Sequence, residues 1–245
     1  MPLTNLRLPV SRKTILSLAF VAAMGSVPII IAVSSDTIFL SSWQFNGTNL
    51  LPAPPAAGSD TSKAELAELR RIQETRTPED LKKARADAAN QTVFLFKDVF
   101  GDGFTADGLP ATARFFARVA NDESVFVDVP KDYWKRLRPA ALDPGIQPCA
   151  PTNGFSYPSG HATRGYVFGV LLAAAVPEKH DAIFGRAAEY ARNRVICGAH
   201  FPSDVEAGRL LGTSLAAVML AQPGFSKDFQ AIQIELRRAG YIAGD

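Results

Sequence analysis

Two histidines of the 245-residue chain lie in short segments that could bind an anion and react with it. The first segment, Pro158–His161, places a serine and a glycine at an expected helix start, whose free backbone N–H groups attract anions. The second contains Arg194, His200 and Asp204, in that order. A carboxylate near a histidine accepts one ring N–H, fixes the tautomer and leaves the other nitrogen as a nucleophile. The alternatives are an ordinary helix cap with a surface histidine and a buried ion pair.

A basic segment precedes both histidines. Lys131 is followed by Arg138-Pro139, with Tyr133 and Trp134 between them. Alone, such a segment is typical of a solvated helix face.

In this order the three segments resemble the signature of the type 2 phosphatidic acid phosphatase (PAP2) superfamily, which also includes the vanadium-dependent haloperoxidases. Further segments look like those of bacterial class A non-specific acid phosphatases, namely Leu50–Pro55, Asp132–Trp134 and Val195–His200. The resemblance covers about residues 50 to 225. It implies a single-domain helical bundle of the PAP2/haloperoxidase type and an acid phosphatase that acts on small phosphate esters without a metal or other cofactor.

The resemblance also assigns roles to individual residues. His200 attacks phosphorus and forms a phosphohistidine, and Asp204 holds it in place. His161 protonates the leaving oxygen and then deprotonates the water that releases phosphate. The residues expected to bind the phosphate oxygens are Lys131, Arg138, Ser159, Gly160 and Arg194. Because His200 must be neutral and His161 charged, we predict a bell-shaped pH profile with its maximum on the acidic side of neutrality.

The chain departs from this family pattern at three places. Asn193 stands before Arg194 where the family usually has serine, although its amide could still donate to phosphate. Ala162 replaces a threonine, and Phe201-Pro202 replaces tryptophan and glutamine; both changes are expected to alter the pocket lining. The third histidine, His180, is expected to be exposed and inert, which gives a catalytic zinc site little support.

The amino-terminal residues have the layout of an export signal. Arg7, Arg12 and Lys13 precede the uncharged apolar run Thr14–Val33, which ends in small residues suited to a signal peptidase. At about 20 residues the run could also span a bilayer uncleaved. Residues 1–34 are therefore expected to be a signal peptide or membrane anchor, and the protein periplasmic or secreted; a buried helix is the alternative. Any membrane contact should go through this segment alone.

Cys149 and Cys197 are the two cysteines of the chain. In an exported protein they are readily interpreted as one disulfide, and two buried thiols are the alternative. Both also fall where the class A phosphatases carry cysteines, so the resemblance implies the disulfide.

The remaining sequence predicts a Pro-rich lead-in over residues 35–58 and one all-α domain over residues 59–245, with about seven to nine helices. Capping boxes are expected at Ser62/Glu65 and Ser203/Glu206. The expected helices begin near Ser62, Pro78, Pro110, Gly160, Ser203 and Phe225, with one more ending at Gly198; the helix from Pro110 should end near Ala120. The balance of 26 basic and 24 acidic residues gives no reason to expect nucleic acid as a partner.

Three other functions remain open from the sequence. The same residues could hold vanadate on His200 and oxidise halides, as a haloperoxidase does. A lipid phosphate phosphatase is a second alternative, and a non-catalytic phosphate-binding protein is a third, motivated by Asn193. A homo-oligomer is compatible with the sequence.

Overall fold

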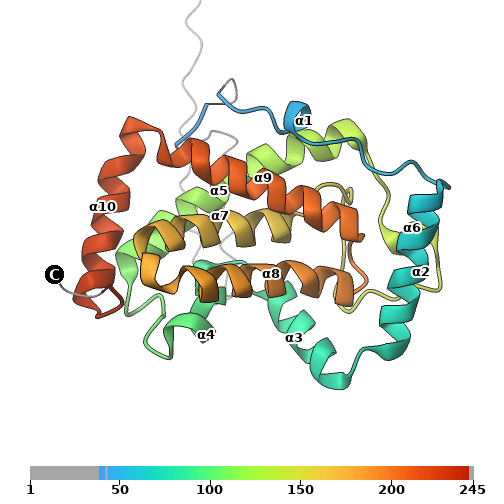
Figure 1. The fold of residues 1–245 in the computed structure, drawn as a ribbon, viewed down its shortest axis with the longest axis horizontal. Coiled ribbons are helices and arrows are strands. Elements are labelled where there is room, and N and C mark those ends of the chain that lie inside the picture. Colours follow the sequence, from blue (N-terminus) through green and yellow to red (C-terminus); the bar gives the residue numbers. More distant parts are fainter. Residues whose placement is uncertain (1–38, 42–43, 243–245) are drawn as a thin grey trace, which may run out of the picture. The chain divides into compact units, whose positions relative to one another are not determined.

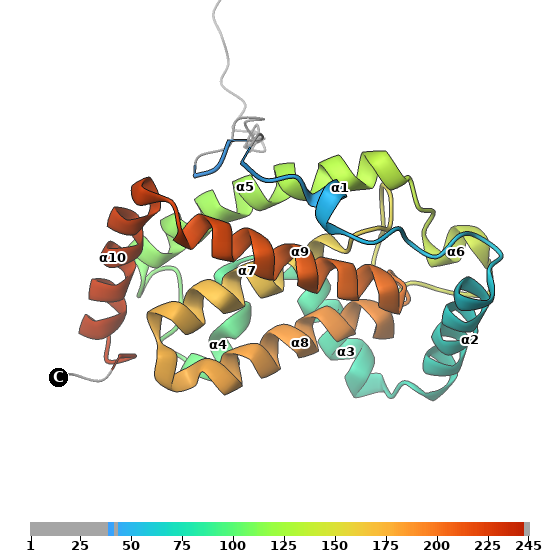
Figure 2. The same cartoon turned by 45° about the horizontal axis from the view of Figure 1, so that its top comes forward.

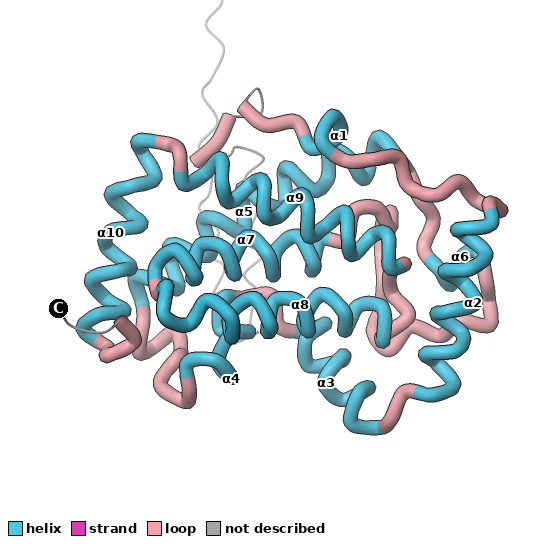
Figure 3. Tube along the Cα trace, in the orientation of Figure 1, coloured by secondary structure: helices cyan, strands magenta, loops and turns pink. Residues whose placement is uncertain are grey.

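The computed structural model describes residues 39–41 and 44–242, and in these residues it contains helices and no strands (Figures 1 and 3). The predicted all-α class is confirmed. The expected signal or anchor, residues 1–34, lies outside the described residues. No helix in the described part combines the length and apolar character needed to cross a bilayer.

Seven of the helices in the described residues run for 12 residues or more, and α1, α4 and α6 are single turns. Two short 3-10 turns complete them, at Val93–Phe96 and Pro177–Lys179. The helices are α1 (Gly47–Leu50), α2 (Asp60–Thr75), α3 (Pro78–Ala89), α4 (Lys97–Phe100), α5 (Pro110–Trp134), α6 (Pro139–Leu142), α7 (Gly160–Ala175), α8 (His180–Ile196), α9 (Pro202–Leu220) and α10 (Pro223–Arg238).

Helix α7 lies between α8 and α9 and packs against both (Figures 1 and 2). Two glycines of α9 allow its backbone to approach α7 closely: a Cβ at Gly212 would lie 2.3 Å from the Thr163 carbonyl oxygen, and one at Gly208 would lie 2.6 Å from that of Ser159. The Ser159 N–H also donates to the Asp204 carbonyl, at 2.9 Å. This crossing holds the first turn of α7 beside the first turn of α9.

Both expected capping boxes are wrong, because α2 and α9 begin at other residues than the sequence predicted. Helix α2 begins one residue after Ser59, whose hydroxyl accepts from the Ser62 N–H. Helix α9 begins at Pro202, so Ser203 already lies inside it, and the Asp204 carboxylate accepts from the Phe201 N–H at 2.9 Å. Sequence spacing alone did not distinguish these neighbouring polar residues.

Helix α5 continues to Trp134 instead of ending near Ala120. Tertiary contacts support the polar residues that follow Ala120, because Asp122 accepts from the backbone N–H groups of Phe39 and Leu40, at 2.7 and 3.2 Å. These contacts outweigh the weak local helix signal. The extension carries Lys131 to the far end of the helix.

Cys149 and Cys197 form a disulfide in the structure, as expected. The Cys149 N–H donates to the Cys197 carbonyl oxygen at 2.8 Å, beside the bridge. The disulfide therefore ties the loop between α6 and α7 to the end of α8.

Replacing both cysteines by serine should lower the free energy of unfolding by up to about 4 kcal/mol, because the bridge closes a loop of 48 residues in the unfolded chain. Urea unfolding of the oxidised wild type and the double variant would measure the loss. Equal stabilities would show that the bridge does not restrain the unfolded state.

Candidate active site

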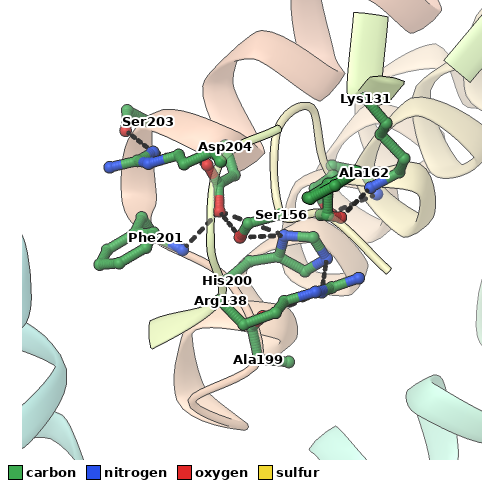
Figure 4. A network of polar contacts seen from close by, with 12 residues as sticks. Lys131, Arg138, Ser156, Ala162, Ala199, His200, Phe201, Ser203 and Asp204 are labelled. Carbon is green, nitrogen blue, oxygen red and sulfur yellow. Dashed lines mark hydrogen bonds and ion pairs between the residues drawn. The ribbon is translucent and has the colours of Figure 1, made fainter. Parts of the chain in front are cut away.

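His200 lies in the turn between α8 and α9 and is almost fully buried. Gly198, with φ of +73°, ends α8 and directs the chain into this turn. The ring Nδ1 lies 3.3 Å from an Asp204 carboxylate oxygen, and the Arg138 guanidinium donates to Nε2 at 2.7 Å (Figure 4). An arginine can only donate, so Nε2 is the acceptor and Nδ1 carries the proton. This tautomer makes Nε2 the nucleophilic nitrogen.

Three groups besides His200 hold the Asp204 carboxylate. Ser156 donates its hydroxyl to it, and the Phe201 N–H donates at 2.9 Å (Figure 4). Arg136 donates to it at 2.5 Å. Burial alone would raise the pKa of Asp204, but its contacts with His200 and Arg136 hold that pKa below its usual value. The carboxylate stays ionised and fixed behind the imidazole.

Arg136 was not identified from the sequence, although it lies inside the Lys131–Arg138 segment. Its guanidinium donates to Glu65 of α2 at 2.7 Å and lies 4.0 Å from the centre of the Phe201 ring. Arg136 thereby joins α2 to the first turn of α9. Neither contact has a local sequence signal, because Glu65 lies 71 residues away in the chain.

Beside His200 lies a cavity of about 410 Å³. Six of the predicted site residues line it: Lys131, Arg138, Gly160, His161, Arg194 and His200. Of the other two, Asp204 lies behind His200, and Ser159 caps α7 through a contact of its hydroxyl oxygen with the Ala162 N–H. The structure therefore brings both histidines and three cations to the walls of one cavity.

The three cations differ in their partners. Lys131 donates to the Phe155 carbonyl at 2.7 Å, and Arg138 donates to the Asn153 carbonyl at 2.8 Å. Arg194 is 3% exposed, and its Nε and Nη1 have no hydrogen-bond partner. Burial lowers the pKa of Arg194, as it does that of Lys131, which falls to about 8. A buried guanidinium without a partner is costly, and an anion in the cavity would satisfy it.

His161 lies in the first turn of α7, and its Nε2 contacts the Ala88 carbonyl at 3.2 Å. That carbonyl belongs to the last turn of α3, where the helix dipole favours a positive charge. The contact leaves Nδ1 for a ligand in the cavity. The two histidines are thus oriented through opposite ring nitrogens, His200 through Nδ1 and His161 through Nε2.

A family model described as the PAP2 superfamily matches residues 115–228, a range that contains all eight predicted catalytic and phosphate-binding residues. Over this range, which is just under half of its length, the chain is similar to the PAP2 superfamily. A non-specific acid phosphatase of Providencia stuartii is 29% identical over 220 residues, which is 85% of this chain and 88% of the relative. An acid phosphatase of Zymomonas mobilis is 27% identical over 209 residues, which is 81% of this chain and 79% of that relative.

The fold of this chain is also similar to that of a solved structure, described as the first bacterial vanadium-dependent iodoperoxidase. The two align with a TM-score of 0.57 and 20% identity, over 72% of this chain and 53% of the other. At this identity the likeness concerns the fold alone.

The departures from the PAP2 pattern lie outside the cavity wall. Asn193 donates its amide to Asp87 at 2.7 Å and does not line the cavity, so this amide is not placed to donate to a phosphate there. Ala162 lies at the crossing of α7 with α9, and Phe201 stacks on Arg136; neither lines the cavity, contrary to expectation. These three residues support the site from behind.

The surroundings of His161 bear on the charge expected for it. Burial and the neighbouring Arg194 lower the pKa of His161 to about 3. Burial is likewise the main reason that the pKa of His200 falls to about 3. His161 is therefore neutral at about pH 7 without a ligand, and an anion bound beside it would raise its pKa toward the charged form.

These pKa values predict that the unliganded protein loses stability as the pH falls from about 6.5 to about 3. In this window the unfolded histidines bind protons and the folded ones do not, so stability rises with pH by up to about 2.7 kcal/mol per pH unit. Urea unfolding with and without phosphate would test this. His161→Gln should reduce the slope, and a stability equal at about pH 7 and about pH 5 would contradict it.

Proposed function

We propose that this chain hydrolyses phosphate monoesters without a metal, through a phosphohistidine formed on His200. One observation carries the proposal: the buried Arg194 guanidinium, with two unpartnered nitrogens, lines the cavity that His161 and His200 share. Such a cavity can bind an anion and hold it next to an imidazole that reacts with it. The names of the similar acid phosphatases support a phosphomonoesterase.

In the first half of the reaction, Lys131, Arg138 and Arg194 bind the phosphoryl oxygens. Once the Arg138 N–H turns from His200 Nε2 to a phosphoryl oxygen, the lone pair on Nε2 attacks phosphorus, and the new N–P bond forms as the bond to the ester oxygen breaks. His161, protonated while the anion is bound, donates its proton to the leaving oxygen. Asp204 stabilises the positive charge that develops on the His200 ring.

In the second half, water replaces the departed alcohol. His161 is now neutral and accepts a proton from the water as the water oxygen attacks phosphorus. The N–P bond breaks, His200 returns to its neutral state, and phosphate leaves. Each histidine ends the cycle in its starting form.

Export is a further part of this proposal, supported by the basic residues and apolar run of residues 1–34. Fractionation of cells that express the full chain, with amino-terminal sequencing of the product, would test it. Mature protein in the periplasm or medium is the expected result, and full-length protein in the cytosol would overturn it.

A steady-state assay tests the proposed reaction. The chelator-treated protein should release phosphate from p-nitrophenyl phosphate, with a bell-shaped dependence of kcat between about pH 4 and about pH 9. Loss of activity on chelation, restored by a divalent metal, would overturn the metal-free reaction. A flat pH profile would contradict the acid and base role of His161.

A further inference from the structure

The cavity extends beyond the phosphate-binding cations, along helix α5. Lys131 lies at one end of a stripe of cavity-lining residues on this helix, and Asp128, Ser124 and Glu123 follow toward its amino terminus. Successive turns of a helix rise by about 5.4 Å, so the stripe leads away from the phosphate site. An in-line attack by His200 places the leaving group on the opposite side of phosphorus. The leaving group needs space beyond the phosphate site, and the outer part of the cavity along this stripe offers that space.

The part of the cavity wall along this stripe, called the outer wall, is polar, and hydrogen bonds hold most of its side chains in place. Arg164, one turn after His161 on α7, donates to Glu123 at 2.6 and 2.9 Å, to Ser124 at 2.9 Å and to Gln91 at 2.7 Å. Glu123 is 1% exposed, so its charge and that of Arg164 neutralise each other in a buried pair. Both side chains are held in place by these contacts.

Asp128 differs from its neighbours because its side chain has no hydrogen bond or ion pair with another described residue, although it lines the cavity. The outer wall therefore carries two carboxylates, Glu123 and Asp128, against the one guanidinium of Arg164. The inner end carries Lys131, Arg138 and Arg194. Since Glu123 and Arg164 offset each other, Asp128 leaves this outer wall with one negative charge, while the inner end is positive.

We propose that Asp128 makes the site selective for zwitterionic phosphate monoesters, in which the leaving group bears an ammonium group, over esters whose leaving group bears a second anion. The inference rests on the proposed phosphatase function and names the substrate class of that site. Opposite charges a few ångström apart attract even in water, and like charges repel by the same amount. Reversal of the leaving-group charge should therefore change kcat/KM by about tenfold.

Three esters of similar length test this: 2-aminoethyl phosphate, 2-hydroxyethyl phosphate and phosphoglycolate, which have cationic, neutral and anionic leaving groups. At about pH 7 and low salt, the wild type should prefer the cationic ester over the anionic one by about tenfold. In Asp128→Asn that ratio should approach one. For the wild type, added salt of about 0.5 M should also reduce the ratio.

Asp132→Asn is the matched control, since Asp132 is an exposed acid one turn further along α5 that does not line the cavity. This variant should keep the wild-type ratio. Equal ratios in wild type and Asp128→Asn, or an equal loss in Asp132→Asn, would overturn the role of Asp128 while the phosphatase activity stands. If the wild type hydrolyses none of these esters and no p-nitrophenyl phosphate, the proposed function fails, and this inference fails with it.

Discussion

The His200→Ala variant should lose at least about 10⁴-fold of the wild-type kcat on p-nitrophenyl phosphate, because the covalent route loses its nucleophile. The cavity keeps Lys131, Arg138 and Arg194, so inorganic phosphate should still bind. Initial rates, together with the thermal shift that phosphate causes, would separate the two effects.

His180→Ala is the control for this experiment. His180 is exposed, contacts Asp181 at 3.2 Å and lies outside the cavity, so its variant should retain wild-type activity. Residual turnover in His200→Ala within about tenfold of the wild type would show that another group attacks phosphorus.

The Arg194→Met variant should lose about 10²- to 10³-fold in kcat/KM, the usual cost of removing one group that stabilises the charge of a transition state. The free energy of unfolding without phosphate, in contrast, should not fall. Because Arg194 is buried without a partner for two of its nitrogens, its replacement by an apolar side chain should leave the unliganded protein as stable as the wild type or more so. Stabilisation by phosphate should be lost at the same time.

Arg192→Met is the matched control, because Arg192 is exposed on the same helix and lies outside the cavity. Both variants would be measured by steady-state kinetics and by thermal unfolding with and without phosphate. If Arg194→Met were less stable without phosphate than the wild type, Arg194 would have a structural partner in the empty protein. Undiminished kcat/KM would remove it from the phosphate site.

The sequence predicted the helical class, and its local signals also named six residues that line one cavity in the structure. Most expected helices begin or end at a proline, a capping serine or threonine, or a glycine, and the structure places them close to those residues. Helix α5 was predicted too short because its continuation depends on contacts of Asp122 with Phe39 and Leu40, which are more than 80 residues away. Periodicity within a window cannot detect such contacts.

The supporting residues of the site were harder to predict for the same reason. Ser156 and Arg136 reach Asp204 from segments 48 and 68 residues away, and neither is one of the positions by which the three sequence segments were recognised. The low pKa of His161 also depends on burial, which follows from tertiary packing and not from the residues adjacent in sequence. Residue identity predicted which groups could react, whereas their protonation state required the structure.

The central claim is that phosphate passes through His200 Nε2, and trapping the intermediate tests it most directly. In His161→Ala, p-nitrophenyl phosphate should still phosphorylate the protein, because nitrophenolate leaves without a proton, while hydrolysis of the intermediate lacks its base. Rapid quenching into alkali and peptide mass spectrometry should find close to one acid-labile phosphoryl group per chain, on His200. A phosphoryl group on any other residue, or steady turnover with an unmodified His200 at every time point, would contradict the account.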